Sequence, residues 1–248
     1  MHSDQQNHPM LAKVRAILAK AEDPAASPEE SQAYFAKAAD LMSKYGIERA
    51  MIAESLPETD KPTKRVVIES GSYLLDRVNL LMSVVDALGG QSVRWRSYDW
   101  DSGKYVQKVE IHGYESVLDR AEMLYTSLLL QAFNGMKKGR PLPGESTTAY
   151  RKTWLAGFRS AVTERLGVAE RAAVDEADRQ LGGKAELVLA KREDTIRAIF
   201  KAAHPKIRSA PKRRLTGSGW HEGVTAGERA DLGTNPRVDS SRRQSLSA

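Results

Sequence analysis

Near the start of the chain, apolar residues recur every three or four positions in two successive stripes. The stripes consist of Leu11, Val14, Leu18 and Ala21, and of Tyr34, Phe35, Ala38, Leu41, Met42 and Tyr45. This spacing predicts two amphipathic helices, which pack antiparallel as a hairpin over residues 8–53 because the turn between them is short. Ser27 and Glu30 have the spacing of a capping box that starts the second helix, and Gly46 is predicted to end it.

The middle of the chain contains strand-like patterns. Residues 54–64 hold two prolines and few apolar groups, and they are predicted to be a linker. An α+β domain is predicted over residues 65–204. It contains a β-hairpin, since side chains alternate between apolar and polar over residues 92–100 and 105–112. A short β-branched run at residues 66–68 is typical of a further strand.

Helical spacing recurs between and after these strands. Helices are predicted over residues 73–88, 116–136 and 147–178. The last of them is expected to project or break after Gly167. Residues 186–190 are predicted to form a last strand and residues 194–204 a short helix. The chain is therefore expected to have an α+β fold that is mainly helical.

The last residues, 205–248, form a basic tail rich in Gly, Ser and Arg, with too few apolar side chains to fold alone. From Lys201 onward the chain has ten Lys/Arg and four Asp/Glu, so this segment carries the whole net charge of +6. Such an asymmetry indicates a polyanionic partner. Glycines 219, 223 and 227 would share one face of a short helix over residues 219–232. Another backbone or a phosphate could approach that face closely, although a flexible tail with a short docking helix is favoured.

The residue types present exclude several kinds of chemistry. The chain has no cysteine, which rules out disulfides, thiolate nucleophiles and zinc sites that need sulfur. His221-Glu222 begins like a zincin helix, but Thr225 stands where the second histidine is required. His112 and His204 have no ligand-spaced neighbours, and no phosphate-binding loop or nucleophile elbow occurs. No catalytic residue, metal ligand or cofactor is therefore predicted.

The residues predicted to bind nucleic acid are cationic or aromatic. They are Lys206, Arg208, Lys212, Arg213, Arg214 and Trp220 in the tail, and Arg94 and Arg96 on the hairpin. The tail cations would neutralise phosphates, and Trp220 could stack on an unpaired base. On the hairpin, Arg94 and Arg96 share one strand face and Trp95 takes the other. A buried Trp95 with solvated arginines is favoured over a stacking surface.

The N-terminal motifs resemble those of a known family. The sequence KVRAILAKAEDP at residues 13–24 is followed by SPEE at 27–30, AKA at 36–38, LM at 41–42 and YGI at 45–47. These motifs are similar to the family called domain of unknown function 2786. Farther on, residues 150–166 and 218–232 resemble the region that usually follows it in actinobacterial and phage proteins. The family has no established activity, so the resemblance implies no catalytic residues.

We expect a non-enzymatic protein of the cytoplasm that associates with DNA or RNA through its basic tail. No run of about 18 apolar residues and no apolar secretion signal occurs, so no membrane partner is expected. One alternative is a phage or mobile-element enzyme that acts on nucleic acid or protein through a site that no motif marks. The other is an interaction module whose N-terminal hairpin binds a protein partner.

Overall fold

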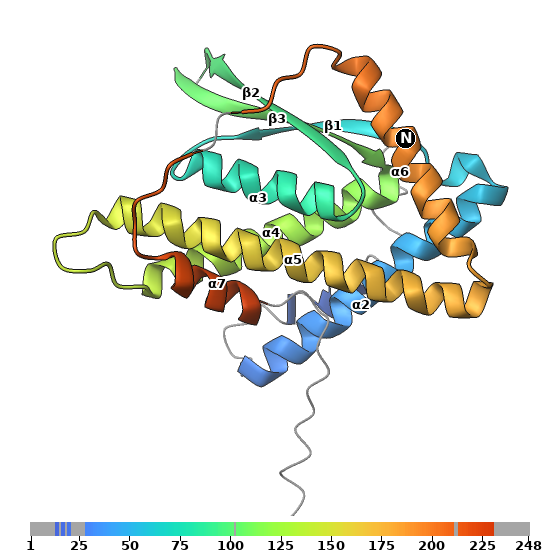
Figure 1. Cartoon of the computed structure of the whole chain (residues 1–248), viewed down its shortest axis with the longest axis horizontal. Coiled ribbons are helices and arrows are strands. Elements are labelled where there is room, and N and C mark those ends of the chain that lie inside the picture. The colour runs from blue at the N-terminus through green and yellow to red at the C-terminus, as the bar shows by residue number, and fades with distance from the viewer. Residues whose placement is uncertain are drawn as a thin grey trace, which may run out of the picture. The chain divides into compact units, whose positions relative to one another are not determined.

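The computed structural model describes residues 13–14, 16–17, 19–20, 28–101, 103–210 and 213–230. The chain divides into two units, of which the larger is Ser43–Ala230, and the described residues before Ser43 belong to the other. Long helices and one three-stranded antiparallel sheet make up the described residues (Figure 1). The expected α+β fold, mainly helical, is confirmed.

The sheet has strand β3 (Lys104–Tyr114) between β1 (Pro62–Glu69) and β2 (Gln91–Asp99). The predicted hairpin is β2–β3, and Gly103 takes a positive φ of 66° in its turn. Strand β1 extends well beyond the β-branched run at residues 66–68. It can begin with a proline because it is an edge strand. Proline has no backbone N–H, and on an edge strand that N–H is not always needed for a hydrogen bond to a neighbouring strand.

The two faces of the sheet have different surroundings. One face packs on helices α3 (Leu74–Ala87) and α4 (Glu115–Lys138), which lie along the sheet in Figure 1. On this face Val109 and Ile111 are fully buried, and Glu69 accepts a hydrogen bond from Tyr125 of α4. We call the opposite one the outer face. It carries Lys64, Val66, Ile68, Gln91, Val93, Trp95, Lys108, Glu110 and His112.

Two helices that follow the sheet are longer than the sequence predicted. Helix α5 runs from Thr147 to Leu181 without interruption, so of the two alternatives after Gly167, projection or a break, the break is wrong. The predicted strand at residues 186–190 is also wrong, because these residues lie in helix α6 (Lys184–Ala203). The buried positions of α6 are Ala185, Val188, Arg192, Ile196 and Phe200. Their helical spacing spans the whole helix, whereas the short window at its start contains too few of them to show it.

Gly46 does not end the helix in which it lies. Helix α2 spans Pro28–Ser55, and a Cβ at position 46 would overlap the guanidinium of Arg120. That guanidinium pairs with Glu170 of α5. Glycine at this position leaves room for the close approach of that arginine, and the helix ends farther along the chain. The capping box at Ser27 lies outside the described residues, as does much of the first helix of the predicted hairpin.

The segment predicted as a linker, residues 54–64, contains folded elements. A 3-10 turn at Pro57–Thr59 leads into β1, and between them Asp60 is only 1% exposed. The division of the chain into domains at this segment stays a prediction. Within the part of the chain that the structure describes, no helix has the length and apolarity needed to cross a bilayer.

Helix α7 (Trp220–Arg229) forms within the predicted segment 219–232 and packs on α5. A Cβ at Gly219 would lie 2.6 Å from the carbonyl oxygen of Tyr150, and one at Gly227 would lie 2.6 Å from that of Phe158. The evenly spaced glycines therefore let two helix backbones touch, which was one of the two interpretations of their spacing. The segment has few apolar side chains of its own, and its helix is stabilised by packing against α5.

We expect Gly223→Ala to lower the free energy of unfolding by about 2 kcal/mol, because the added methyl group would overlap the carbonyl oxygen of Trp154. Alanine is the better helix former, so helix propensity alone would change stability in the opposite direction. Urea denaturation of the full chain measures the difference. Thr225→Ala, on the exposed side of the same helix, is the matched control. Equal midpoints for Gly223→Ala and the wild type would contradict the close packing of α7.

Candidate metal centre

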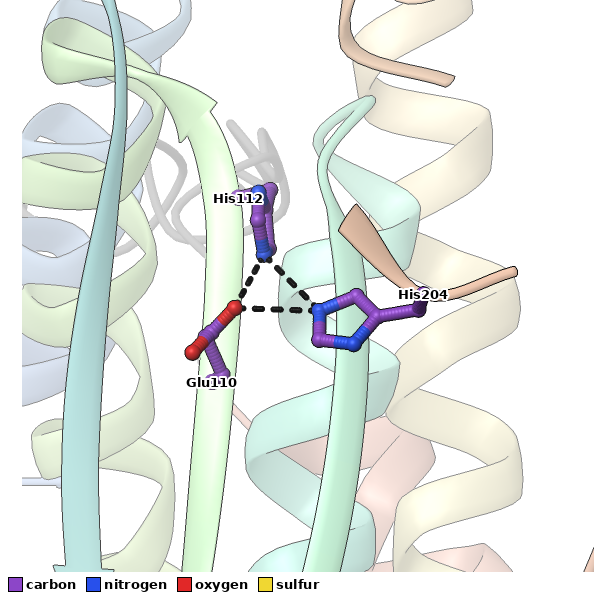
Figure 2. A group of neighbouring side chains, drawn as sticks. All are labelled: Glu110, His112 and His204. Carbon is purple, nitrogen blue, oxygen red and sulfur yellow. Dashed lines mark hydrogen bonds and ion pairs between the residues drawn. The ribbon is translucent and has the colours of Figure 1, made fainter. Parts of the chain in front are cut away.

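Three side chains that can bind metal meet on the outer face of the sheet. Glu110 and His112 lie two residues apart on β3, so both point to the same face. His204 directly follows α6 and reaches the same point from the other side (Figure 2). The strand and the helix end together bring one carboxylate and two imidazoles within reach of one ion.

The three ligand atoms form a compact triangle. The Oε1 of Glu110 lies 2.7 Å from the Nε2 of His112 and 3.0 Å from the Nε2 of His204. The two Nε2 atoms are 3.3 Å apart. Ligands at about 2.0–2.2 Å from one ion, in adjacent octahedral or tetrahedral positions, are themselves about 3 Å apart. The triangle therefore has the size of one face of a metal coordination sphere.

The triangle can be held by hydrogen bonds or by a cation. If both Nε2 atoms carry hydrogen, both donate to Glu110 while lying 3.3 Å from each other. If both Nε2 atoms lack hydrogen, two lone pairs and a carboxylate oxygen converge on one point. A cation between the three atoms then makes all three contacts favourable. The donor set and its geometry therefore fit a metal ion.

The surroundings of the triangle hold it in place. Phe200 lies one helical turn before His204, and its ring packs edge-on against His112 with 5.3 Å between centroids. The side chain of His112 is 3% exposed and that of Glu110 11%, whereas that of His204 is 22% exposed. Solvent therefore reaches the cluster on the side of His204, and the two residues of β3 form its buried wall.

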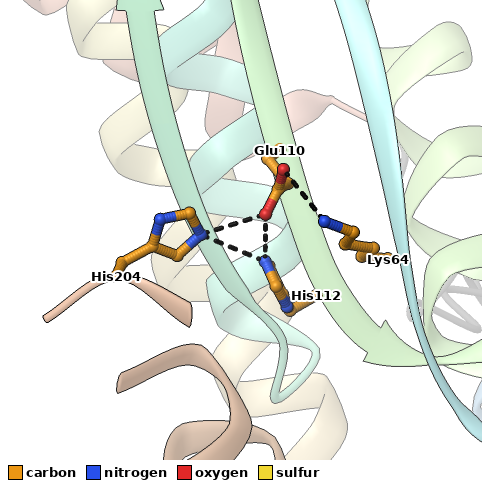
Figure 3. A network of polar contacts seen from close by, with 4 residues as sticks. All are labelled: Lys64, Glu110, His112 and His204. Atoms are coloured by element: carbon orange, nitrogen blue, oxygen red, sulfur yellow. Dashed lines mark hydrogen bonds and ion pairs between the residues drawn. The ribbon is translucent and has the colours of Figure 1, made fainter. Parts of the chain in front are cut away.

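Glu110 carries the charge of the cluster. Burial by itself raises the pKa of this carboxyl, but the hydrogen bonds from His112 and His204 and the charge of Lys64 together outweigh it and lower the pKa below its ordinary value. The Nζ of Lys64 lies 3.6 Å from Oε2, the carboxylate oxygen that the histidines do not contact (Figure 3). Lys64 therefore contacts one carboxylate oxygen of Glu110, and the other oxygen, Oε1, contacts the two imidazoles.

The cluster was not predicted from the sequence. Glu110 and His112 have the two-residue spacing of side chains on one face of a strand, which differs from the helical spacing of the zincin motif. That spacing was visible in the sequence. The third member, His204, lies 92 residues after His112, and no local pattern connects them. In the incomplete zincin motif, His221 is exposed, and Glu222 accepts a hydrogen bond from Tyr150 at 2.6 Å.

The cations predicted to bind nucleic acid in the tail have different environments. Lys206, Arg208 and Arg214 are exposed to solvent. Arg213 instead pairs with Asp76 of α3 at 2.7 Å and so holds the segment against that helix. Lys212 lies outside the described residues. Trp220 is 40% exposed at the start of α7. The role of these residues in binding stays a prediction.

The hairpin residues are arranged differently from the favoured expectation. Trp95 lies on the outer face and is 40% exposed, so the expectation that it is buried in the core is wrong. Its position differs because α6 covers only one end of that face. Arg94 and Arg96 are on the opposite face, where the guanidinium of Arg96 stacks on the ring of Tyr105 at 3.5 Å.

Comparison with known proteins identifies one segment of the chain. Residues 10–49 match the model of the family described as "Protein of unknown function (DUF2786)". This confirms the resemblance seen in the N-terminal motifs. No curated protein and no solved structure matches the chain significantly. The DUF2786 segment ends well before Glu110, His112 and His204, so the family supplies no role for the metal-binding cluster.

Proposed function

We propose that this protein binds one divalent transition-metal ion through Glu110, His112 and His204. The observation that carries the proposal is the triangle of three ligand atoms at 2.7, 3.0 and 3.3 Å. Two imidazoles and one carboxylate suit Fe²⁺, Co²⁺ and Zn²⁺. They also form a pre-arranged site, since the residues come from a paired strand and the end of a packed helix.

The proposed site is of the reactive type. Structural zinc sites usually have four protein ligands, whereas three protein ligands leave positions for water and for a substrate atom. An ion held in this way polarises a bound oxygen or lowers the pKa of bound water. Lys64 stands beside the cluster with its side chain 62% exposed and can pair with an anionic substrate. These features favour the enzyme alternative over a purely structural ion.

Titration of the metal-free full chain with Co²⁺ tests the proposal. We expect one ion to bind per chain, and the visible absorption of Co²⁺ to report its protein ligands. Competition by Zn²⁺ should remove that absorption. A chain that binds no Co²⁺, and holds no metal by elemental analysis after purification under mild conditions, would contradict the proposal.

We also propose that the basic tail associates with DNA or RNA in the cytoplasm, as its charge suggests. The specific support is that Lys206, Arg208 and Arg214 are exposed to solvent. A truncation after residue 200 would be a poor test, because it would remove α7, which packs on α5. The proposal that the N-terminal helical hairpin binds a protein partner also stays a prediction.

Replacing Lys206, Arg208 and Arg214 together by glutamine should weaken binding to nucleic acid and flatten its salt dependence. Each lost phosphate contact is expected to reduce the slope of log K against log salt by about 0.7–0.9. Fluorescence anisotropy at several salt concentrations measures this. The matched control replaces Lys137, Lys138 and Arg140, which are also exposed, and so removes the same charge elsewhere. Equal slopes for the two triple variants would contradict a specific role for the tail.

A further inference from the structure

The outer face of the sheet extends the metal-binding cluster into a larger surface. Its strand register forms three rows of neighbours across the sheet: Lys64, His112 and Gln91; Val66, Glu110 and Val93; Ile68, Lys108 and Trp95. The cluster occupies the first two rows, where Phe200 of α6 also packs. The third row lies beyond it.

Large apolar side chains are exposed beside the cluster. Val66 is 50% exposed, Ile68 61% and Trp95 40%. Val66 and Ile68 are neighbours on the edge strand β1, whereas Trp95 lies on the other edge strand, β2, with Glu110 and Lys108 of β3 between them. The outer face therefore exposes apolar side chains on both sides of a charged central strand, and Trp95 is the aromatic one.

The charge of this surface is complementary to an anion. Lys64 lies in the row of His112, and Lys108 lies next to Trp95. Glu110 is the only carboxylate in the three rows, and it belongs to the metal-binding cluster, while Asp99 lies farther along β2 on the same face. Two more exposed cations, Lys206 and Arg208, follow His204 directly along the chain.

The register also sets the distance between the aromatic ring and the cluster. Trp95 lies diagonally across from Glu110, and diagonal neighbours in an antiparallel sheet are about 7–8 Å apart. A nucleotide spans a comparable distance from its phosphate to its base. A phosphate near Lys64 and the cluster would therefore place an unpaired base over Trp95, where stacking is favourable.

We propose that the outer face binds a single strand of nucleic acid, with a phosphate at the metal-binding cluster and an unpaired base stacked on Trp95. The proposal rests on the metal site proposed above. A strand fits better than a single nucleotide, because Lys64 and Lys108 lie two rows apart on neighbouring strands, a separation suited to two phosphates rather than one. It fits better than a duplex, because paired bases do not expose a ring to Trp95.

The test measures binding of a labelled oligothymidylate by the Co²⁺-loaded full chain with fluorescence anisotropy. Trp95→Ala is expected to raise the dissociation constant about tenfold, and Trp95→Phe to recover much of the loss, because stacking on an aromatic ring is restored. Trp100→Ala is the matched control. Trp100 is 85% exposed, but it packs against Tyr98, which lies on the opposite side of β2 from Trp95.

Each outcome separates the strand-binding surface from the metal site, because bound cobalt is measured in the same samples. Binding that is equal for the wild type and Trp95→Ala would overturn the strand-binding surface while bound cobalt still supports the metal site. Stronger binding of a duplex, or equally effective competition by thymidine monophosphate, would also overturn it. Strand binding that depends on Trp95 but is unchanged when no cobalt is bound would overturn the placement of the phosphate at the metal. A chain that binds no cobalt would overturn the metal site itself.

Discussion

Replacing His204 with alanine is expected to weaken Co²⁺ binding by about 100-fold or more. Loss of residues that merely orient metal ligands already costs about 10- to 100-fold in affinity, and His204 would itself be a ligand. The remaining pair, Glu110 and His112, could hold the ion from one strand only. Isothermal titration calorimetry and the visible spectrum of bound Co²⁺ measure the change.

The fold should tolerate this substitution. The side chain of His204 is 22% exposed, and its backbone N–H closes the end of α6 by donating to the carbonyl of Phe200 at 2.9 Å. Because the side chain is partly exposed and the backbone hydrogen bond does not depend on it, the substitution should change the metal site and leave α6 folded. His221→Ala is the matched control, since it removes an exposed histidine from α7. Equal affinities of the His204→Ala variant and the wild type would show that the ion binds elsewhere.

Binding of the metal should also stabilise the wild type. An ion that binds only the folded chain adds about 2.7 kcal/mol to the free energy of unfolding at a hundred times its dissociation constant. Thermal melts with Co²⁺ and with excess chelator measure this difference. We expect the His204→Ala variant to lose it, because its binding is too weak at the same Co²⁺ concentration.

Asp60→Ala is expected to lower the free energy of unfolding by about 3–5 kcal/mol. The carboxylate of Asp60 is fully buried and accepts hydrogen bonds from the backbone N–H of Ser116 at 3.0 Å and from its hydroxyl at 2.7 Å. It also pairs with Arg192 of α6. The substitution would leave a buried guanidinium without its counter-charge. The same contacts join the start of α4 to α6, so both helices should loosen.

Two further variants make this result specific. Asp60→Asn keeps an oxygen for Ser116 but removes the charge that Arg192 needs, so an intermediate loss is expected. Asp194→Ala breaks an exposed ion pair with Arg197 on the same helix, and exposed pairs contribute little. Urea denaturation of the full chain compares all three. If Asp60→Ala cost no more than Asp194→Ala, the buried pair would not hold α6 in place.

Local patterns in the sequence predicted much of the fold. The apolar stripes of α3, α4 and α5 and the alternation along β2 and β3 were read near their observed bounds. A helix or strand repeats its own geometry along the chain, so a single segment shows its buried side without knowledge of its neighbours. At α6 the helical spacing shows only over the whole helix, and the short window at residues 186–190 did not reveal it. At Gly46 the guanidinium of Arg120, a residue far along the chain, lies against the glycine inside a continuing helix.

The sequence by itself determined a mainly helical α+β chain with a basic tail, an N-terminal segment that matches the DUF2786 model, and glycines spaced by four in that tail. It also placed Glu110 and His112 on one face of a strand, although that spacing was not recognised. Only the tertiary structure decided that α5 receives the glycines, that Trp95 is exposed, and that His204 completes the cluster. The physical reason is that each of these contacts joins residues far apart in the chain. They form only when whole helices and strands pack together.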